Sequence, residues 1–80
     1  MVHQMTREEH LKMCKQRAIQ EYDFYIKTDG HEAAARNGLV SMASDMGKHP
    51  ETNSPATAAL CIFQKPRTRQ EFVNFINGFN

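Results

Sequence analysis

The sequence predicts an all-α fold, a small four-helix bundle built from helical hairpins. Apolar residues recur at spacings of three and four, capping residues precede the helical segments, and no segment alternates apolar and polar residues as a half-buried strand would. The chain has 80 residues, which is enough for one domain. We therefore expect residues 1–80 to form a single helical domain, with a flexible N-terminus over residues 1–5.

The first two helices are predicted over residues 7–27 and 31–46. Thr6 and Glu9 have the spacing of a capping box, in which each side chain bonds the other residue's backbone N–H. Asp29 or Gly30 begins the second helix. The two predicted core stripes are Leu11, Cys14, Ala18, Tyr22 and Tyr25, then Ala35, Leu39, Met42 and Met46. Gly38 interrupts the second helix at a cost of up to about 1 kcal/mol relative to alanine.

Two shorter helices are predicted in the second half of the chain. Ser54 caps the third helix and Pro55 is its first residue, where the missing N–H costs nothing. Thr68 and Glu71 form a second capping-box pattern, and Gly78 ends the fourth helix. The predicted core stripes are Ala56, Leu60 and Phe63, then Phe72, Phe75, Ile76 and Phe79. Breaks are expected near residues 28–31, 47–53 and 64–68.

Composition narrows the class of protein. The chain is 40% hydrophobic and 24% charged, which indicates a folded domain rather than a disordered one. A net charge of +1 argues against duplex nucleic acid as a partner, because duplex binders neutralise many phosphates. The first residues lack the apolar core of a signal peptide, and no run approaches the ~18 apolar residues of a membrane span. We expect no membrane association, a cytoplasmic location and reduced thiols.

A metal site or a nucleophile is an alternative interpretation of the histidine and cysteine residues. His10 and Cys14 are four residues apart on one predicted helix, and His49 and Cys61 could complete a four-ligand site. A cysteine–histidine nucleophile would use the same pair. The simpler interpretation is that Cys14 packs in the core stripe. We therefore predict no metal, no cofactor and no catalytic residue. A tetratricopeptide-like hairpin is a further alternative, but one hairpin cannot establish a repeat.

The segment QKPRTRQ places basic residues at the start of the last helix. A helix N-terminus offers free N–H groups to an anion, and arginine adds two-pronged phosphate contacts. Arg67, Thr68 and Arg69 are therefore predicted to contact the phosphates of a nucleotide. The alternative is a solvated basic loop.

The segment SMASDMGKHPET is a second candidate for ligand contacts. Its polar residues fall on a different helix face from the core stripe, as in any amphipathic helix. Serine and aspartate are poor helix formers, however, so their choice on that face favours a recognition surface. The predicted contacts to a base or ribose are Ser41, Ser44, Asp45, Lys48, His49 and Thr52. The alternatives are a solvated helix end, or an Asp45 that braces the fold.

The back of the first helix is a candidate interface. Met13, Arg17 and Phe24 lie in line opposite its core stripe. Apolar side chains flanking an arginine are typical of protein interfaces. We predict a homo-oligomer through this face. An additional contact inside the bundle is the alternative.

Three motifs give the chain a resemblance to known proteins. TREEHLKMCKQRA, SMASDMGKHPET and FINGF resemble a family of small bacteriophage proteins with a TREEHL-xx-CK-x-RA opening, an SM-x-SD-xx-KHPET centre and an FI-x-GF ending. The chain departs from that pattern in YDFYIKTDGHEAAARNG and over residues 58–67. The resemblance implies a non-enzymatic protein that counters host antiviral defence in the host cytoplasm. It would sequester a cyclic or linear nucleotide messenger or, alternatively, bind a host defence protein such as a CRISPR or restriction component.

Overall fold

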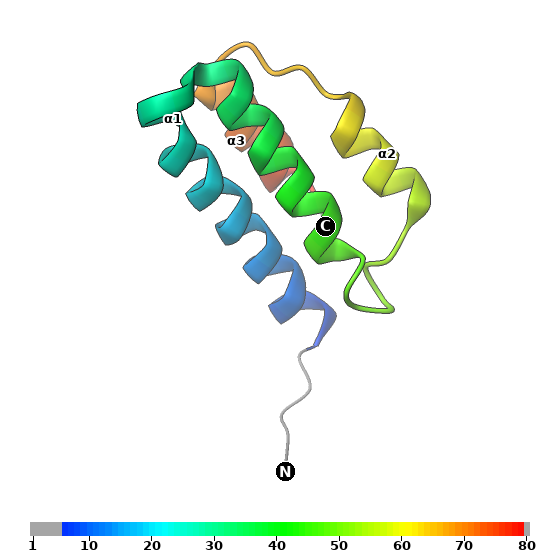
Figure 1. Cartoon of the computed structure of the whole chain (residues 1–80). Coiled ribbons are helices and arrows are strands. Elements are labelled where there is room, and N and C mark those ends of the chain that lie inside the picture. The colour runs from blue at the N-terminus through cyan, green and yellow to red at the C-terminus, as the bar shows by residue number, and fades with distance from the viewer. Residues whose placement is uncertain (1–5, 80) are drawn as a thin grey trace.

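The computed structural model describes residues 6–79, in which three α-helices and no strand occur (Figure 1). The all-helical prediction is confirmed. The helices are α1 (Arg7–Met46), α2 (Pro55–Phe63) and α3 (Arg69–Asn77). The predicted flexible segment, residues 1–5, lies outside the described residues. Thr6 and Glu9 form the expected capping box, and Ser54 and Thr68 each accept a hydrogen bond from the backbone N–H three residues on.

The prediction of a four-helix bundle is wrong, because the first two predicted helices are one helix with a sharp bend. Gly30 alone leaves the helical region, with φ 84° and ψ 172°. Glycine has no Cβ and adopts this conformation without strain, so a single residue reverses the chain. Residues 7–29 (the first segment) and 31–46 (the second segment) then run side by side in opposite directions (Figure 1). Helices α2 and α3 each pack on α1.

The core lies between the two segments of α1 and is closed by α3. Leu11, Cys14, Ala18 and Tyr22 of the first segment are buried, as are Ala35, Leu39, Met42 and Met46 of the second. These residues match the predicted stripes, except that Tyr25 is only half-buried. Phe72 and Ile76 of α3 are fully buried, whereas Phe75 and Phe79 are half-buried. The Phe72 ring stacks on Tyr22 at 4.9 Å between ring centroids.

Gly38 has a packing role that explains its place inside a helix. A Cβ added there would lie 2.9 Å from the Ala18 carbonyl oxygen and 2.8 Å from Cε1 of Phe72. Both distances are too short for a real carbon contact. Gly38 therefore permits the close approach of the two segments and of the Phe72 ring.

The predicted core stripe of α2 is wrong. Ala56 is exposed, Leu60 is 50% exposed and Phe63 is 78% exposed, whereas Cys61 is fully buried. The physical reason is that PATAALCIF is apolar or small almost all round, so its periodicity does not specify an inward face. Thr57 and Ala58 are half-buried on the same helix as Cys61, and the larger Leu60, Ile62 and Phe63 remain on the surface.

Candidate functional site

A cavity of about 600 Å³ lies between the second segment of α1 and the end of α2 with the loop that follows it. We call it the loop cavity. Its volume falls within the range of about 300–1,000 Å³ typical of small-molecule sites. The residues that line it are His31, Glu32, Arg36, Leu39, Val40, Ile62, Gln64, Lys65, Pro66 and Arg67.

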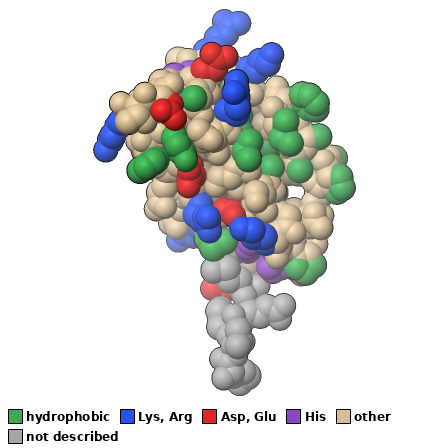
Figure 2. All heavy atoms as spheres, viewed as in Figure 1, with side chains coloured by type: hydrophobic (Ala, Val, Ile, Leu, Met, Phe, Trp, Pro, Cys, Tyr) green, Lys and Arg blue, Asp and Glu red, His purple; other side chains and the backbone are tan. Residues whose placement is uncertain are grey.

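Three exposed cationic residues from two separate parts of the chain line the loop cavity. Arg36 comes from α1, and Lys65 and Arg67 come from the α2–α3 loop. Within residues 6–79 none of these three side chains forms an ion pair. Figure 2 shows lysine and arginine side chains, with acidic side chains among them, at the top of the molecule. Glu32 is the one carboxylate in the lining. The cavity therefore has a positive balance that suits an anion.

Apolar side chains form the rest of the lining. Leu39 is buried beneath the cavity, whereas Val40 is 51% exposed and Ile62 is 60% exposed at its rim. Pro66 completes this surface. Charged and apolar groups side by side suit a ligand that has both an anionic and an apolar part.

His31 fixes the position of the basic loop over the cavity. Its Nε2–H donates to the Pro66 carbonyl at 2.9 Å, and its Nδ1 forms a hydrogen bond with the Tyr22 hydroxyl at 2.5 Å. The Pro66 carbonyl can only accept, so Nε2 carries the proton of that bond. Tyr22 is buried, and burial raises its pKa. The loop that carries Lys65 and Arg67 is thus tied to the helical core rather than left free.

The structure separates the three residues predicted to contact phosphate. Arg67 lines the loop cavity. Thr68 caps α3 by accepting from the Glu71 N–H at 3.1 Å. Arg69 instead makes a two-pronged ion pair with Asp23, with N–O distances of 3.0 and 3.1 Å. The hydrogen bonds from Arg69 hold the pKa of Asp23 below its usual value. Of the three, only Arg67 has a position suited to a ligand in the cavity.

Asp45 lies in a cluster at the opposite end of the molecule. Its side chain is 3% exposed. Lys48 Nζ donates to Oδ1 at 3.2 Å, and Arg17 Nε lies 3.1 Å from Oδ2 without hydrogen-bond geometry. Arg17 belongs to the first segment and Asp45 to the second, so the carboxylate joins the two segments. This placement favours the alternative reading in which Asp45 braces the fold.

The neighbours of Asp45 also make contacts within the fold. His10 is 5% exposed, its Nε2–H donates to the Asp45 carbonyl at 2.7 Å, and its ring stacks on His49 at 5.0 Å. Thr52 is 4% exposed and donates to the Met46 carbonyl at 2.6 Å. We call these residues the Asp45 cluster: His10, Arg17, Asp45, Lys48, His49 and Thr52. Ser44 precedes Asp45 and is exposed, whereas Ser41 is half-buried and directly follows Val40 of the loop-cavity lining.

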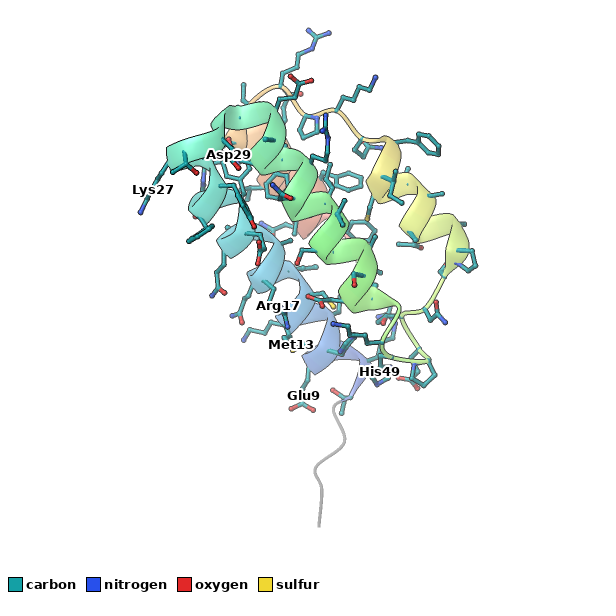
Figure 3. All side chains as sticks on the ribbon, viewed as in Figure 1. Glu9, Met13, Arg17, Lys27, Asp29 and His49 are labelled. Atoms are coloured by element: carbon teal, nitrogen blue, oxygen red, sulfur yellow. The ribbon has the colours of Figure 1, made fainter. Side chains whose placement is uncertain are left out.

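The loop cavity and the Asp45 cluster do not form one site. The loop after α2 crosses the bend end of α1, whereas residues 47–54 turn at the other end (Figure 1). Figure 3 shows Arg17 and His49 in the half of the molecule that contains the start of α1. The structure therefore places Arg67 with Arg36 and Lys65 in the lining of one cavity, and separates it from the Asp45 cluster.

The three residues of the predicted interface on the first segment have different environments. Phe24 is 70% exposed and rests its ring edge-on against Tyr25. Met13 is half-buried, and Arg17 is engaged with Asp45. Figure 3 shows Met13 and Arg17 together near the start of α1. Phe24 is the only large apolar side chain of the three that stands fully exposed.

The two cysteines are buried and unreactive in character. Cys14 and Cys61 are each 0% exposed, and burial raises the pKa of both thiols to about 11. A nucleophilic cysteine needs a lowered pKa, so neither has the properties of one. In the part of the chain that the structure describes, no three histidine, cysteine or acidic side chains gather closely enough to hold a metal ion.

Sequence reasoning missed the α1 side of the loop cavity. Glu32, Arg36 and Val40 are four residues apart, so they lie in line along one face of the second segment. Val40 was the available signal, because it is an apolar residue outside the core stripe. Nothing in the sequence indicated that this line would lie opposite the QKPR loop. That pairing depends on the bend at Gly30 and on the contact between His31 and Pro66.

Comparison with known proteins gives no family assignment: no protein-family model, curated protein or solved structure matches the chain. The resemblance to small bacteriophage proteins therefore stays a prediction. Over residues 6–79, no helix is both long and apolar enough to span a membrane.

Proposed function

We propose that this protein is a non-enzymatic binder that holds a nucleotide in the loop cavity. One observation supports the proposal above all others. Arg36, Lys65 and Arg67 have no ion-pair partners among the described residues, and they line a cavity of about 600 Å³ that also has apolar lining residues. A nucleotide has the matching chemistry, because phosphate takes the cations and the base takes the apolar surface.

The roles of the lining residues follow from their chemistry. Arg36 and Arg67 present planar guanidinium groups, which bind phosphate oxygens through two parallel hydrogen bonds. Lys65 adds a third positive charge. Val40 and Ile62 give the base an apolar surface, and Glu32 can accept hydrogen bonds from base or ribose donors. The tether from His31 to Pro66 positions the loop cations before the ligand arrives, which lowers the entropy cost of binding.

The residues that we now expect to contact phosphate differ in part from those predicted from the sequence. Arg67 keeps its predicted role, while Arg36 and Lys65 take the place of Thr68 and Arg69, which are engaged in the cap of α3 and with Asp23. We assign the Asp45 cluster a structural role, because its carboxylate and hydroxyl groups form hydrogen bonds within the fold.

Binding without catalysis fits the role that the family resemblance implies. Both thiols have a pKa raised to about 11, so neither supplies a nucleophile at neutral pH. The proposed cellular role is to lower the free concentration of a cyclic or linear nucleotide messenger in the host cytoplasm, and so to counter antiviral defence.

A thermal-shift screen of cyclic and linear nucleotides tests the proposal. A ligand present at about 100 times its dissociation constant adds about 2.7 kcal/mol to stability. For a domain of this size, that corresponds to a rise in melting temperature of roughly 10–20 °C. Arg36→Ala and Arg67→Ala should each abolish most of the shift.

Lys12→Ala is the matched control. Lys12 is exposed on the first segment and lies outside the cavity lining, so its loss removes the same charge without touching the site. It should leave the shift intact. A screen in which no nucleotide raises the melting temperature would contradict the proposal, as would equal effects of Lys12→Ala and Arg67→Ala.

The rival function is a protein inhibitor that docks on a host defence protein through the first segment. The observation in its favour is the 70% exposure of Phe24. This function predicts no stabilisation by nucleotides and loss of host-protein capture in Phe24→Asp. Arg17 is held by Asp45 and Met13 is half-buried, so the rival has one prominent side chain in its support.

A further inference from the structure

Helix α2 carries an exposed apolar surface that the fold itself does not use. Leu60, Ile62 and Phe63 are 50%, 60% and 78% exposed, and Cys61 is the only fully buried residue of the helix. Figure 2 shows hydrophobic side chains gathered on the right of the molecule, over α2. Exposed apolar patches of a few hundred Å² commonly mark interaction sites.

The arrangement around α2 places a projecting ring beside an apolar cleft. With Cys61 facing the core, helical geometry sets Leu60 and Ile62 about 100° to either side and Phe63 roughly opposite. On the Leu60 side lies a cleft of about 290 Å³ between α2 and α3. Its other lining residues are Asn74, Phe75, Gly78 and Phe79. Phe63 is next to Leu60 on the helix surface, so ring and cleft share one face of the molecule.

Helix α2 and the residues that flank it carry no charged side chain. Residues 52–64 contain no aspartate, glutamate, lysine, arginine or histidine, although 24% of the chain is charged. A charged surface that meets its own copy brings like charges together, which costs several kcal/mol. The α2 face can meet itself without that cost. A ring and a cleft on the same face are also what a two-fold interface requires, because each copy must offer both parts.

We propose that α2 is a self-association surface through which two copies of the chain form a two-fold dimer. Phe63 of each copy enters the cleft between α2 and α3 of the other copy. The interface is small, because α2 has nine residues and is about 13 Å long. Such an interface falls in the class that buries less than about 1,200 Å² in total, which is typical of weak association. The proposal therefore specifies a dimer that dissociates on dilution through the micromolar range.

The dimer is independent of the nucleotide proposal. The loop cavity lies on the Ile62 side of α2, and the cleft lies on the Leu60 side. Paired copies would leave both loop cavities open. Loss of dimerisation therefore would not imply loss of ligand binding, and each proposal can fail alone.

Sedimentation equilibrium from about 10 to 500 micromolar protein tests the dimer. The wild-type protein should shift from monomer to dimer across this range, and Phe63→Asp should remain monomeric throughout. Phe24→Asp distinguishes this surface from the interface predicted on the first segment, because Phe24 is a similarly exposed phenylalanine on α1. It should dimerise as the wild type does. Phe63→Ser is a second variant in case the aspartate disturbs the end of α2, and circular dichroism checks that helix content is unchanged.

Salt dependence adds an independent readout. Because α2 carries no charged side chain, raising the salt from about 0.05 to 0.5 M should leave the dimer constant unchanged or strengthen it. The proposal is overturned by a wild type that is monomeric at about 500 micromolar, by a dimer that salt dissolves, or by disruption in Phe24→Asp with none in Phe63→Asp.

Discussion

The paired cations around Asp45 make a sharp prediction about stability. Asp45 has a side chain that is 3% exposed, whereas Arg17 and Lys48 are 51% and 62% exposed. Removing one cation leaves the carboxylate with the other, and each partner is half in water, so Arg17→Ala and Lys48→Ala should each cost about 1 kcal/mol or less. Removing both leaves a buried charge without a partner, for which the cost is about 3–5 kcal/mol.

The double variant should therefore lose more stability than the two single variants combined, by more than about 1 kcal/mol. Urea unfolding followed by circular dichroism measures the free energy of unfolding for all four proteins. Asp45→Asn removes the buried charge itself, so it should cost about 1–2 kcal/mol, less than the double variant. Costs that add to within about 0.5 kcal/mol would refute the reasoning, because they would mean that solvent or another group already satisfies Asp45.

Two further predictions concern the core. Gly38→Ala should lower stability by up to about 2 kcal/mol in thermal unfolding, because close contacts with Phe72 and a backbone carbonyl outweigh the gain in helix propensity. Gly47→Ala is the control and should be neutral or stabilising, because Gly47 has a helical φ of −69° and a Cβ there would make only ordinary contacts. A larger loss of stability in Gly47→Ala than in Gly38→Ala would contradict the packing role of Gly38. Burial raises the pKa of Cys14 and Cys61 from 9.0 to about 11, so stability should be full below pH 9 and fall between pH 9 and 11, where thiols of the unfolded chain ionise first. The fall should shrink in the double Cys→Ala variant, and an identical pH profile would count against buried neutral thiols.

Local signals in the sequence were sufficient for most of the fold. The caps at Thr6, Ser54 and Thr68 act over three residues, so they can be identified without knowing the rest of the structure. The core stripes of α1 and α3 were identified for the same reason. The side of α2 that faces the core could not be predicted, because apolar residues lie almost all round this helix and do not single out one side. In the structure Cys61 is buried, and Leu60, Ile62 and Phe63 are exposed.

The candidate site was only partly predictable, because it depends on contacts between distant residues. Arg67 was identified from a local basic segment. Arg36 was not, since it meets that segment only after the chain reverses at Gly30 and His31 bonds Pro66. The polar stretch over residues 41–52 suggested a recognition surface, and burial gave Asp45 and Thr52 partners within the fold instead. Composition alone cannot separate these roles, because both use short polar side chains.

The most direct test of the proposed site is a titration followed by amide chemical shifts. The ¹⁵N-labelled protein is titrated with whichever nucleotide gives the largest thermal stabilisation, and shift changes are mapped on the structure. We expect saturable changes concentrated at residues 31–41 and 62–67, with residues 44–52 little affected. Changes concentrated at residues 44–52, or no saturable change from any nucleotide, would contradict the assignment of the loop cavity as the ligand site.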